Sequence, residues 1–270
     1  MCILFWKLDN SSAKYKFIFA ANRDEFLNRP TSLASWWNPN ILSGLDLLKP
    51  VRGTWLGINR EGRFTAVTNY REPKMVGSEA LLSRGAIVKT ILECDSSLEQ
   101  CLNKVKNESH MYNGFNLISV DLNDENLEVF YLSNRGSGEI KRLNSEEIYG
   151  LSNSLLDDPW PKVKYGIDEL KSICEQELSE EKLIENLFRL LCTTHPYEHS
   201  NVKLNIRIPK HDDDGFYGTR TSTVILVDRD NNVVFVEKTW YDENENFIED
   251  ERGRWFRFKI GKMDNNTQTN

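Results

Sequence analysis

The second residue of the chain is a cysteine, and its position would allow it to act as a nucleophile. A Met before a small residue such as Cys2 is normally trimmed, which would leave Cys2 with a free α-amine. That amine has an ordinary pKa of about 7.7–8.0, against about 8.5 for the thiol. One residue would then supply both a nucleophile and a weak base. The alternative is that Cys2 simply begins a buried strand.

A charged tetrad, Asn22-Arg23-Asp24-Glu25, follows the second apolar stretch. Residues 2–8 and 15–21 predict a hairpin, in which the start of one strand faces the end of the other. The tetrad should therefore lie beside Cys2, where Asp24 could bind an ammonium and Arg23 could lower the thiol pKa. Little apolar area depends on Asp24, so its loss should affect the site more than the fold. The alternative is a charged turn at the surface.

Three further residues could contact a substrate. Asn69 and Asn153 each follow a predicted apolar strand, where an amide could donate a hydrogen bond to an oxyanion. Asparagine at a strand end is otherwise a common turn residue. Arg220 precedes the apolar stretch 221–228 and could hold a carboxylate or phosphate. The alternative for Arg220 is a surface ion pair.

No metal site is predicted. His195 and His199 are four residues apart, as zinc ligands on one helix face can be, but Pro196 lies between them and no HExxH pattern is present. A site that combined them with His211 and Asp212 to Asp214 is the weaker alternative. The sequence also lacks a P-loop, a dinucleotide fingerprint and a GxSxG elbow.

Composition narrows the class of protein. The net charge of −7 argues against a nucleic-acid partner. Five cysteines with no CxxC pair favour a reducing compartment and free thiols. Cys94, Cys101, Cys174 and Cys192 lie among apolar residues and are expected to be small core side chains.

The sequence also predicts a cytoplasmic protein. The apolar run at residues 2–6 is too short for a signal peptide, and no stretch approaches the roughly 20 apolar residues of a membrane span. Any association with an organelle would then be peripheral.

The order of predicted elements indicates an α+β fold. Hairpins are expected at 2–8 with 15–21 and at 55–59 with 63–69, and residues 22–30 are expected to leave the strand and form a loop. Helices are expected at 81–93, around 98–105, from Pro161, and at 180–192. Strands are expected at 116–121, 127–133, 149–151, 221–228, 233–240 and 255–260. Paired helices between hairpins predict a four-layer αββα sandwich of two mainly antiparallel sheets. We expect one domain, residues 1–262, and a disordered tail, residues 263–270.

Several motifs together resemble one family. They are Met1-Cys2-Ile3, the NRDE tetrad at 22–25, and the segments GTWLG at 53–57, TNYR at 68–71, GLSNS at 150–154, PWPKV at 159–163 and YGTR at 217–220. The chain is identified on these motifs as similar to the transport-and-Golgi-organisation-2 family, the NRDE-motif family. The resemblance runs from residue 1 to about residue 240 and implies the N-terminal-nucleophile hydrolase fold.

The family resemblance implies a function in haem trafficking, in Golgi organisation and secretion, and in coenzyme A and lipid homeostasis. Its pocket would bind a haem- or acyl-CoA-like ligand, with haem as cargo rather than as a fixed cofactor. Asn22, Glu25, Tyr70 and Arg71 would contact that ligand. The location implied is the cytoplasm, in association with mitochondria or the Golgi.

A more distant resemblance implies an enzyme. Bile-salt and penicillin V hydrolases also begin Met-Cys and carry a segment like GINREG at 57–62 that leads to Asn-Tyr. Their pattern implies Cys2 as the nucleophile, Asn69 and Asn153 as oxyanion donors, and Arg220 as a late arginine. Their early motif has an arginine three residues before the aspartate, whereas here Arg23 directly precedes Asp24. The alternative function is therefore a cysteine amidohydrolase that acts on a carbon–nitrogen or thioester bond.

Overall fold

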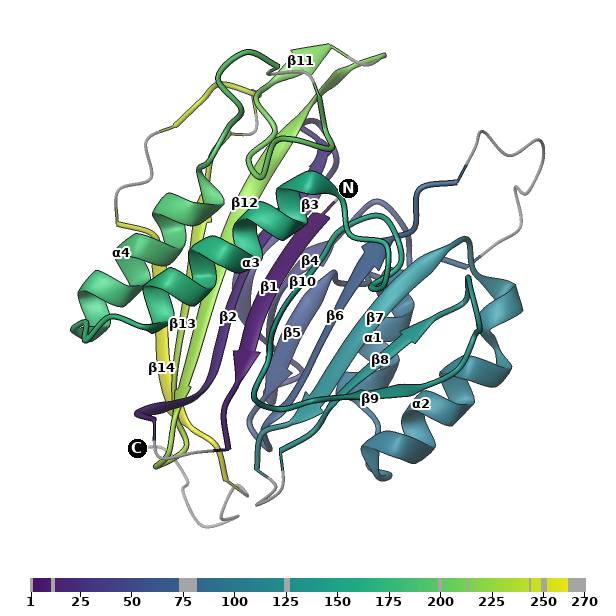
Figure 1. The fold of residues 1–270 in the computed structure, drawn as a ribbon. Coiled ribbons are helices and arrows are strands. Elements are labelled where there is room, and N and C mark those ends of the chain that lie inside the picture. Colours follow the sequence, from purple (N-terminus) through teal and green to yellow (C-terminus); the bar gives the residue numbers. More distant parts are fainter. Residues whose placement is uncertain are drawn as a thin grey trace, which may run out of the picture.

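The computed structural model describes residues 2–10, 13–72, 82–123, 127–198, 201–212, 214–242, 244–248 and 252–261. The predicted tail, residues 263–270, lies outside them, as do Met1 and His199. The described strands form two antiparallel seven-stranded sheets that face each other (Figure 1).

The first sheet contains the N-terminal strand near its edge. Its order is β10 (Ile148–Leu151), β1 (Cys2–Leu8), β2 (Tyr15–Phe26), β12 (Phe216–Asp228), β13 (Asn232–Thr239) and β14 (Arg254–Lys259), with the short β11 (His211–Asp212) beside β12. The order of the second sheet follows the sequence. It runs β3 (Thr31–Trp37), β4 (Ile41–Asp46), β5 (Leu56–Asn59), β6 (Arg63–Asn69), β7 (Phe115–Asp121), β8 (Val129–Ser133) and β9 (Lys141–Leu143).

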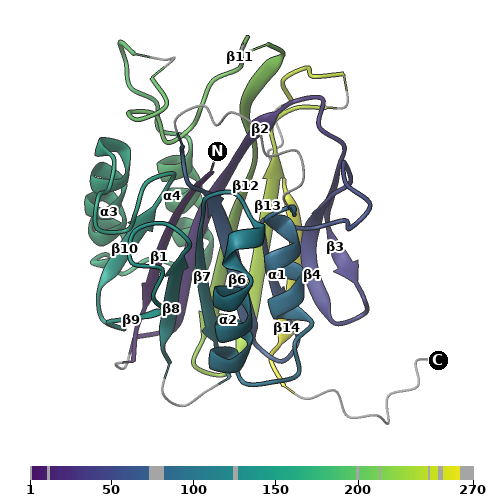
Figure 2. The same cartoon turned by 90° about the vertical axis from the view of Figure 1, so that its right-hand side faces the viewer.

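Helices cover the outer face of each sheet, as predicted. Helices α3 (Pro161–Cys174) and α4 (Glu180–Leu191) pack on the first sheet. Helices α1 (Gly85–Leu92) and α2 (Leu98–Asn107) lie over the second sheet (Figure 2), and the 3₁₀ turn η1 (Ser109–Met111) follows α2. The αββα sandwich is therefore confirmed.

Both faces of the N-terminal hairpin are buried. Inward side chains of β1 and β2, including Trp6, Phe17 and Phe19, pack between the sheets against Phe64 of β6. Outward side chains such as Phe5 and Ile18 pack under α3 and α4. Strands that are covered on both faces read as continuous apolar runs, which explains the composition of residues 3–8 and 17–21.

Two features of the first 50 residues differ from the prediction. Residues 22–26, expected to be part of a loop, are the last part of β2, which runs to Phe26. Strands β3 and β4 lie at residues 31–46, where no strand was predicted. Neighbouring strands supply polar partners for the tetrad, so a buried strand can hold it. Ser, Gly and Asn residues interrupt the apolar pattern at 31–46, and this interruption obscures both strands in the sequence.

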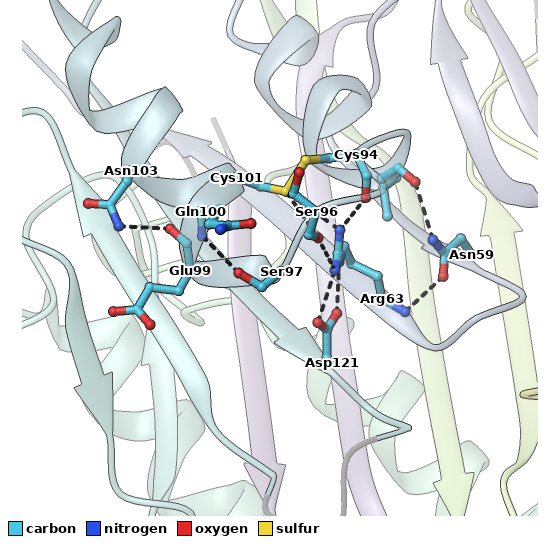
Figure 3. The surroundings of a disulfide bond; sticks show 11 residues. Asn59, Arg63, Cys94, Ser96, Ser97, Glu99, Gln100, Cys101, Asn103 and Asp121 are labelled. Carbon is cyan, nitrogen blue, oxygen red and sulfur yellow. Dashed lines mark hydrogen bonds and ion pairs between the residues drawn. A yellow bond between two sulfur atoms is a disulfide. The ribbon is translucent and has the colours of Figure 1, made fainter.

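The expectation of free thiols is wrong for Cys94 and Cys101, which form a disulfide (Figure 3). Cys94 lies in the turn after α1 and Cys101 in the first turn of α2, with Cα atoms 6.5 Å apart. The Arg63 side chain donates to the carbonyls of Cys94 and Ser96 at 2.5 and 3.0 Å and pairs with Asp121 at 2.8 Å. The fold of this turn brings together two cysteines that are seven residues apart and do not form a CxxC motif. Cys2, Cys174 and Cys192 remain as thiols.

No helix in the described ranges is long and apolar enough to cross a membrane.

The contact between α3 and β1 gives a test of the layer packing. A Cβ atom on Gly166 would lie 2.1 Å from the Phe5 ring, so only glycine fits there. Gly166→Ala is expected to lower the free energy of unfolding by about 1–3 kcal/mol, the cost of overpacking, although alanine otherwise favours a helix. Gly261→Ala, where a Cβ would meet nothing within 4 Å, is the control for chemical denaturation. Equal stability of both variants would contradict this packing.

Candidate active site

The start of β1 and the end of β2 form one wall of a small cavity, as the hairpin prediction requires. Cys2 lies opposite Arg23 in the antiparallel register, so the two side chains share the face turned toward the second sheet. The cavity has a volume of about 110 Å³. Its walls contain five of the predicted site residues, Cys2, Arg23, Asp24, Glu25 and Asn69, and eight others, Arg29, Asp46, Thr54, Trp55, Val67, Ser83, Arg84 and Gly85.

Arg23 is held rigidly in this wall. Its side chain is 4% exposed, and its guanidinium carbon lies 4.2 Å from the centre of the Trp55 ring. It donates to Thr31 Oγ1 at 3.1 Å and faces Asp46 Oδ2 at 3.5 Å. Arg23 is thus a fixed positive charge beside Cys2.

The Cys2 thiol is not activated by Arg23 alone. Burial raises its pKa, and Asp24 raises it further, whereas Arg23 and a hydrogen bond from the Asp24 backbone act in the opposite direction. Arg23 lowers the thiol pKa as predicted, but desolvation of the thiolate outweighs the attraction of the guanidinium, so the net shift is upward. A reaction at Cys2 would need a base close to the sulfur.

Asp24 is fully buried at the same strand end. Its Oδ1 accepts a hydrogen bond from Thr219 Oγ1 at 2.6 Å, and its carbonyl accepts one from the Tyr217 hydroxyl at 2.8 Å. Burial raises the pKa of Asp24, and the nearby Lys162 ammonium opposes that rise. Lys162 itself is 1% exposed. Sequence reasoning missed it because a lone lysine in an amphipathic helix is normally solvated.

The two asparagines are close together but face different spaces. Asn69 lies in the wall of the Cys2 cavity. Asn153 Nδ2 donates to the Asn69 carbonyl at 2.7 Å, and Ser152 Oγ joins Asn153 Oδ1 to the Cys2 carbonyl at 3.1 and 2.8 Å. Asn69 thus forms part of the cavity wall, and Asn153 braces its backbone; the oxyanion role of both residues stays a prediction.

Arg220 lies beside the cavity but is not part of its wall. It is the extra residue of a β-bulge, since Thr219 pairs with Asp24 and Thr221 with Arg23. Bulges redirect a side chain. Here Nη1 of Arg220 donates to the carbonyls of Phe26 and Arg29. The guanidinium therefore fastens the β2–β3 turn.

The ligand-contact residues expected from the family resemblance divide into three groups. Asn22 is fully bonded within the fold, to Leu191, Ile206 and Ser222. Glu25 stays in the cavity wall near Arg29, at 3.7 Å. Tyr70 and Arg71 line a second, larger cleft of about 550 Å³, together with Glu72, Asn153, Ser154, Asp158, Trp160, Asn201, Val202 and Lys203.

Arg84 and Asp46 are cavity residues that sequence reasoning missed. Arg84 precedes α1 and donates to the Gly114 carbonyl at 3.1 Å, and burial lowers its pKa. Asp46 ends β4 and accepts from Arg29 Nε at 2.6 Å. Neither belongs to a motif. A correct prediction of β4 would have brought Asp46 to the strand end that faces the tetrad.

In the ranges that the structure describes, no three His, Cys, Asp or Glu side chains form a metal-binding group. His195 is in the described part, and its Nδ1 faces the backbone N–H of Tyr197 at 3.4 Å.

A family model described as Transport and Golgi organisation 2 matches residues 1–242. The chain belongs to this family. It is 37% identical to the mouse Transport and Golgi organization 2 homolog, with 90% of this chain and 95% of the mouse protein covered. It is 32% identical to the Drosophila melanogaster Transport and Golgi organization protein 2, with 88% and 92% covered.

Solved structures show the N-terminal-nucleophile hydrolase fold. The Caenorhabditis elegans N-acylethanolamine-hydrolyzing acid amidase ortholog superposes with a TM-score of 0.52 at 14% identity, over 84% of this chain and 92% of that one. A single-residue variant of a conjugated bile acid hydrolase from Clostridium perfringens gives a TM-score of 0.53 at 10% identity, over 97% and 98%. At these identities the likeness establishes the fold of this Transport and Golgi organisation 2 family member and no activity.

The burial of Asp24 changes the expectation that its loss would spare the fold. Asp24→Ala is expected to lower the free energy of unfolding at neutral pH by about 3 kcal/mol, because it leaves the buried Lys162 ammonium without its counter-charge. Asp157→Ala, at a carboxylate that is 72% exposed, should change it by less than about 0.5 kcal/mol. Urea unfolding measures both, and matching losses would show that the Asp24 charge is not coupled to the fold.

The pH dependence of that loss has a definite sign. Burial lowers the pKa of Lys162, so between the folded and unfolded values the unfolded chain binds more protons and stability rises with pH. The deficit of Asp24→Ala should therefore shrink as pH rises toward the ordinary lysine pKa of about 10.4. A deficit that is constant with pH would contradict the Asp24–Lys162 pairing.

Proposed function

We propose that the protein is a cysteine N-terminal-nucleophile hydrolase that cleaves a carbon–nitrogen or thioester bond, with Cys2 as its mature first residue. One observation carries this proposal: Cys2, Arg23 and Asn69 converge on a single cavity from three different strands, and Asp24 lies beside them at the end of β2. The cavity volume of about 110 Å³ suits a reacting group. It is well below the roughly 300–1,000 Å³ typical of sites that enclose a whole ligand.

In the proposed reaction the Cys2 amine takes the thiol proton, and the thiolate attacks the substrate carbonyl carbon. The Asn69 amide donates to the oxyanion, while Asn153 holds the Asn69 backbone in place. The amine then gives the proton to the leaving nitrogen or sulfur as the bond to carbon breaks. Water attacks the acyl-Cys2 thioester, releases the acid and restores the thiol.

The surroundings of Cys2 suit these steps. Arg23 and Arg84 place positive charge on the cavity side of the sulfur, where a thiolate would form. The raised thiol pKa explains why a base is required at the sulfur itself. Similar folds occur in proteins described as an amidase, an acylase and a bile acid hydrolase, which is consistent with a hydrolase but does not identify the substrate.

An acylating probe tests the proposal directly. Wild-type protein treated with an activated ester should show, by intact mass and peptide mapping, loss of Met1 and an acyl group on the peptide that begins with Cys2. Cys2→Ala should abolish that adduct. Cys174→Ala is the control and should leave it unchanged, because burial raises the pKa of Cys174 to about 11. Retained Met1 in the purified protein, or an adduct that survives in Cys2→Ala, would exclude the mechanism.

A second candidate function has an observation of its own. The cleft of about 550 Å³ is large enough for a ligand body and has Arg71, Lys203 and the Trp160 ring in its wall. Guanidinium and ammonium groups beside an aromatic face suit a ligand that joins an acidic end to a flat or apolar part. Under this candidate the protein carries a haem- or acyl-CoA-like ligand, in the cytoplasm or at the Golgi or mitochondrial surface, as the family resemblance implies.

Titration with haem and with an acyl-CoA tests this second candidate. Arg71→Ala is expected to weaken binding of such a ligand about tenfold, because a guanidinium that contacts an acidic group contributes more than a surface ion pair. Arg142→Ala, at a guanidinium that is 58% exposed on another strand, is the matched control. Absorbance and calorimetry would follow the two ligands. Equal affinity in both variants, or no binding by the wild type, would leave the cleft without this function.

A further inference from the structure

Lys162 lies in the helix layer, and its charge interacts with Cys2. The proposed reaction gives this charge no role. It is 1% exposed, and among the described residues its Nζ makes no hydrogen bond. Its ring contact is with Trp160, at 5.8 Å from the ring centre. A buried ammonium without hydrogen bonds is costly, and a nearby carboxylate offsets part of that cost.

The position of Lys162 shows which charges it meets. It lies in the first turn of α3, directly after Pro161, and α3 packs on β10 and β1. Figure 1 shows the start of α3 next to the N-terminal end of β1. The groups that interact with its charge are Asp24 and Cys2, which favour the ammonium, and Arg71, which opposes it.

Charged side chains lie on both sides of the sheet around Asp24 and Cys2. Its side chain alternates with that of Arg23 along β2, so it points toward the helix layer that contains Lys162. Arg23 and Arg84 approach Cys2 from the cavity side, and the Tyr217 hydroxyl is bonded to the Asp24 carbonyl. The Cys2 terminus therefore lies between a guanidinium pair on one side and an Asp24–Lys162 pair on the other.

We propose that Lys162 is a positioning residue of the Cys2 site, whose buried ammonium keeps Asp24 ionised so that this carboxylate can orient the amine of mature Cys2. The use of that amine as a base rests on the proposed hydrolase function. The charge coupling between Lys162 and Asp24 does not, and it can be measured without turnover.

The physical argument concerns the protonation of Asp24. Burial favours the neutral acid, and Lys162 is the first of the groups that act against burial. Without the ammonium, Asp24 would take up a proton and lose the charge that attracts an amine. Removal of the Asp24 carboxylate should then shift the pKa of the Cys2 thiol only where Lys162 is present to keep that carboxylate charged.

A double-mutant cycle on thiol alkylation tests this coupling. The rate of iodoacetamide labelling of Cys2, followed by peptide mapping across the titration range of the thiol, gives its midpoint. Asp24→Asn retains an oxygen that can accept from Thr219 and removes the negative charge. It should therefore lower the midpoint pH of the Cys2 titration, and at pH values below that midpoint it should speed labelling about three- to tenfold. In the Lys162→Met background, where Asp24 is already neutral, Asp24→Asn should change the rate by less than about twofold.

The control replaces the other lysine of the same helix turn. Lys164 is exposed, so in a Lys164→Met background the full effect of Asp24→Asn should remain. An equal effect of Asp24→Asn in all backgrounds would overturn the inference. Thermal unfolding confirms that each variant is folded, and Lys162→Gln, which is neutral but polar, replaces Lys162→Met if the latter does not fold.

The two proposals fail in different ways. If the wild type never forms an acyl-Cys2 adduct but the cycle shows coupling, the hydrolase proposal fails and the Lys162–Asp24 charge relation stands. If the adduct forms but the cycle shows no coupling, the hydrolase proposal stands and Lys162 is not its positioning residue.

Discussion

The antiparallel register of β1 with β2 is the constraint on which the rest of the structure depends, because it places Cys2 opposite Arg23. A slip by one residue would turn every side chain of β1 to the other face of the sheet. The aromatic side chains prevent such a slip. Trp6 of β1 lies in the inter-sheet core and stacks on Tyr149 at 5.5 Å between ring centres, so a slip would force it out of that core into the helix layer. Core packing therefore determines the geometry of the charged strand end.

That strand end contains charges that a hydrophobic core would not tolerate on their own. Arg23, Asp24 and Lys162 are each less than 5% exposed, and burial opposes the ionised form of all three. Their partners come from outside the hairpin: Trp55 and Asp46 from the second sheet, Thr219 from β12, and Lys162 from α3. Such an arrangement adds little net stability, since the desolvation of each charge offsets the attraction between them. Its effect is to fix the orientation of groups around Cys2.

The sequence predicted the strands and helices whose apolar residues are regularly spaced. The hairpin around residues 9–14 predicted the meeting of Cys2 with the tetrad, and the spacing of Leu183, Leu187 and Leu191 predicted α4. Their positions at the ends of predicted apolar strands singled out Asn69 and Asn153, which contact each other in the structure. Their different environments depend on a contact between sheets, which no local pattern encodes.

Other site features could not be predicted because their signals are three-dimensional. Residues 31–46 form two strands in which Ser and Gly residues, and a turn with two Asn residues, interrupt the apolar alternation. Charged residues are assigned to the surface by default, which hides Lys162 and Arg84. The disulfide between Cys94 and Cys101 depends on the turn that joins α1 to α2. In each case tertiary contacts override the local preference of the residue type.

The hydrogen bond from Asn153 Nδ2 to the Asn69 carbonyl lies at the boundary between the two spaces of the site. On one side is the small charged cavity at Cys2, and on the other is the cleft with Arg71, Trp160 and Lys203. The residues proposed for catalysis and those proposed for ligand binding thus line separate spaces, although Asn69 and Arg71 are two residues apart in the chain. Substitution at Cys2 would change the small cavity without altering the cleft wall, and substitution at Arg71 would do the reverse. Because the two spaces have different walls, a ligand could occupy the cleft without being cleaved at Cys2. The two candidate functions therefore need not exclude each other.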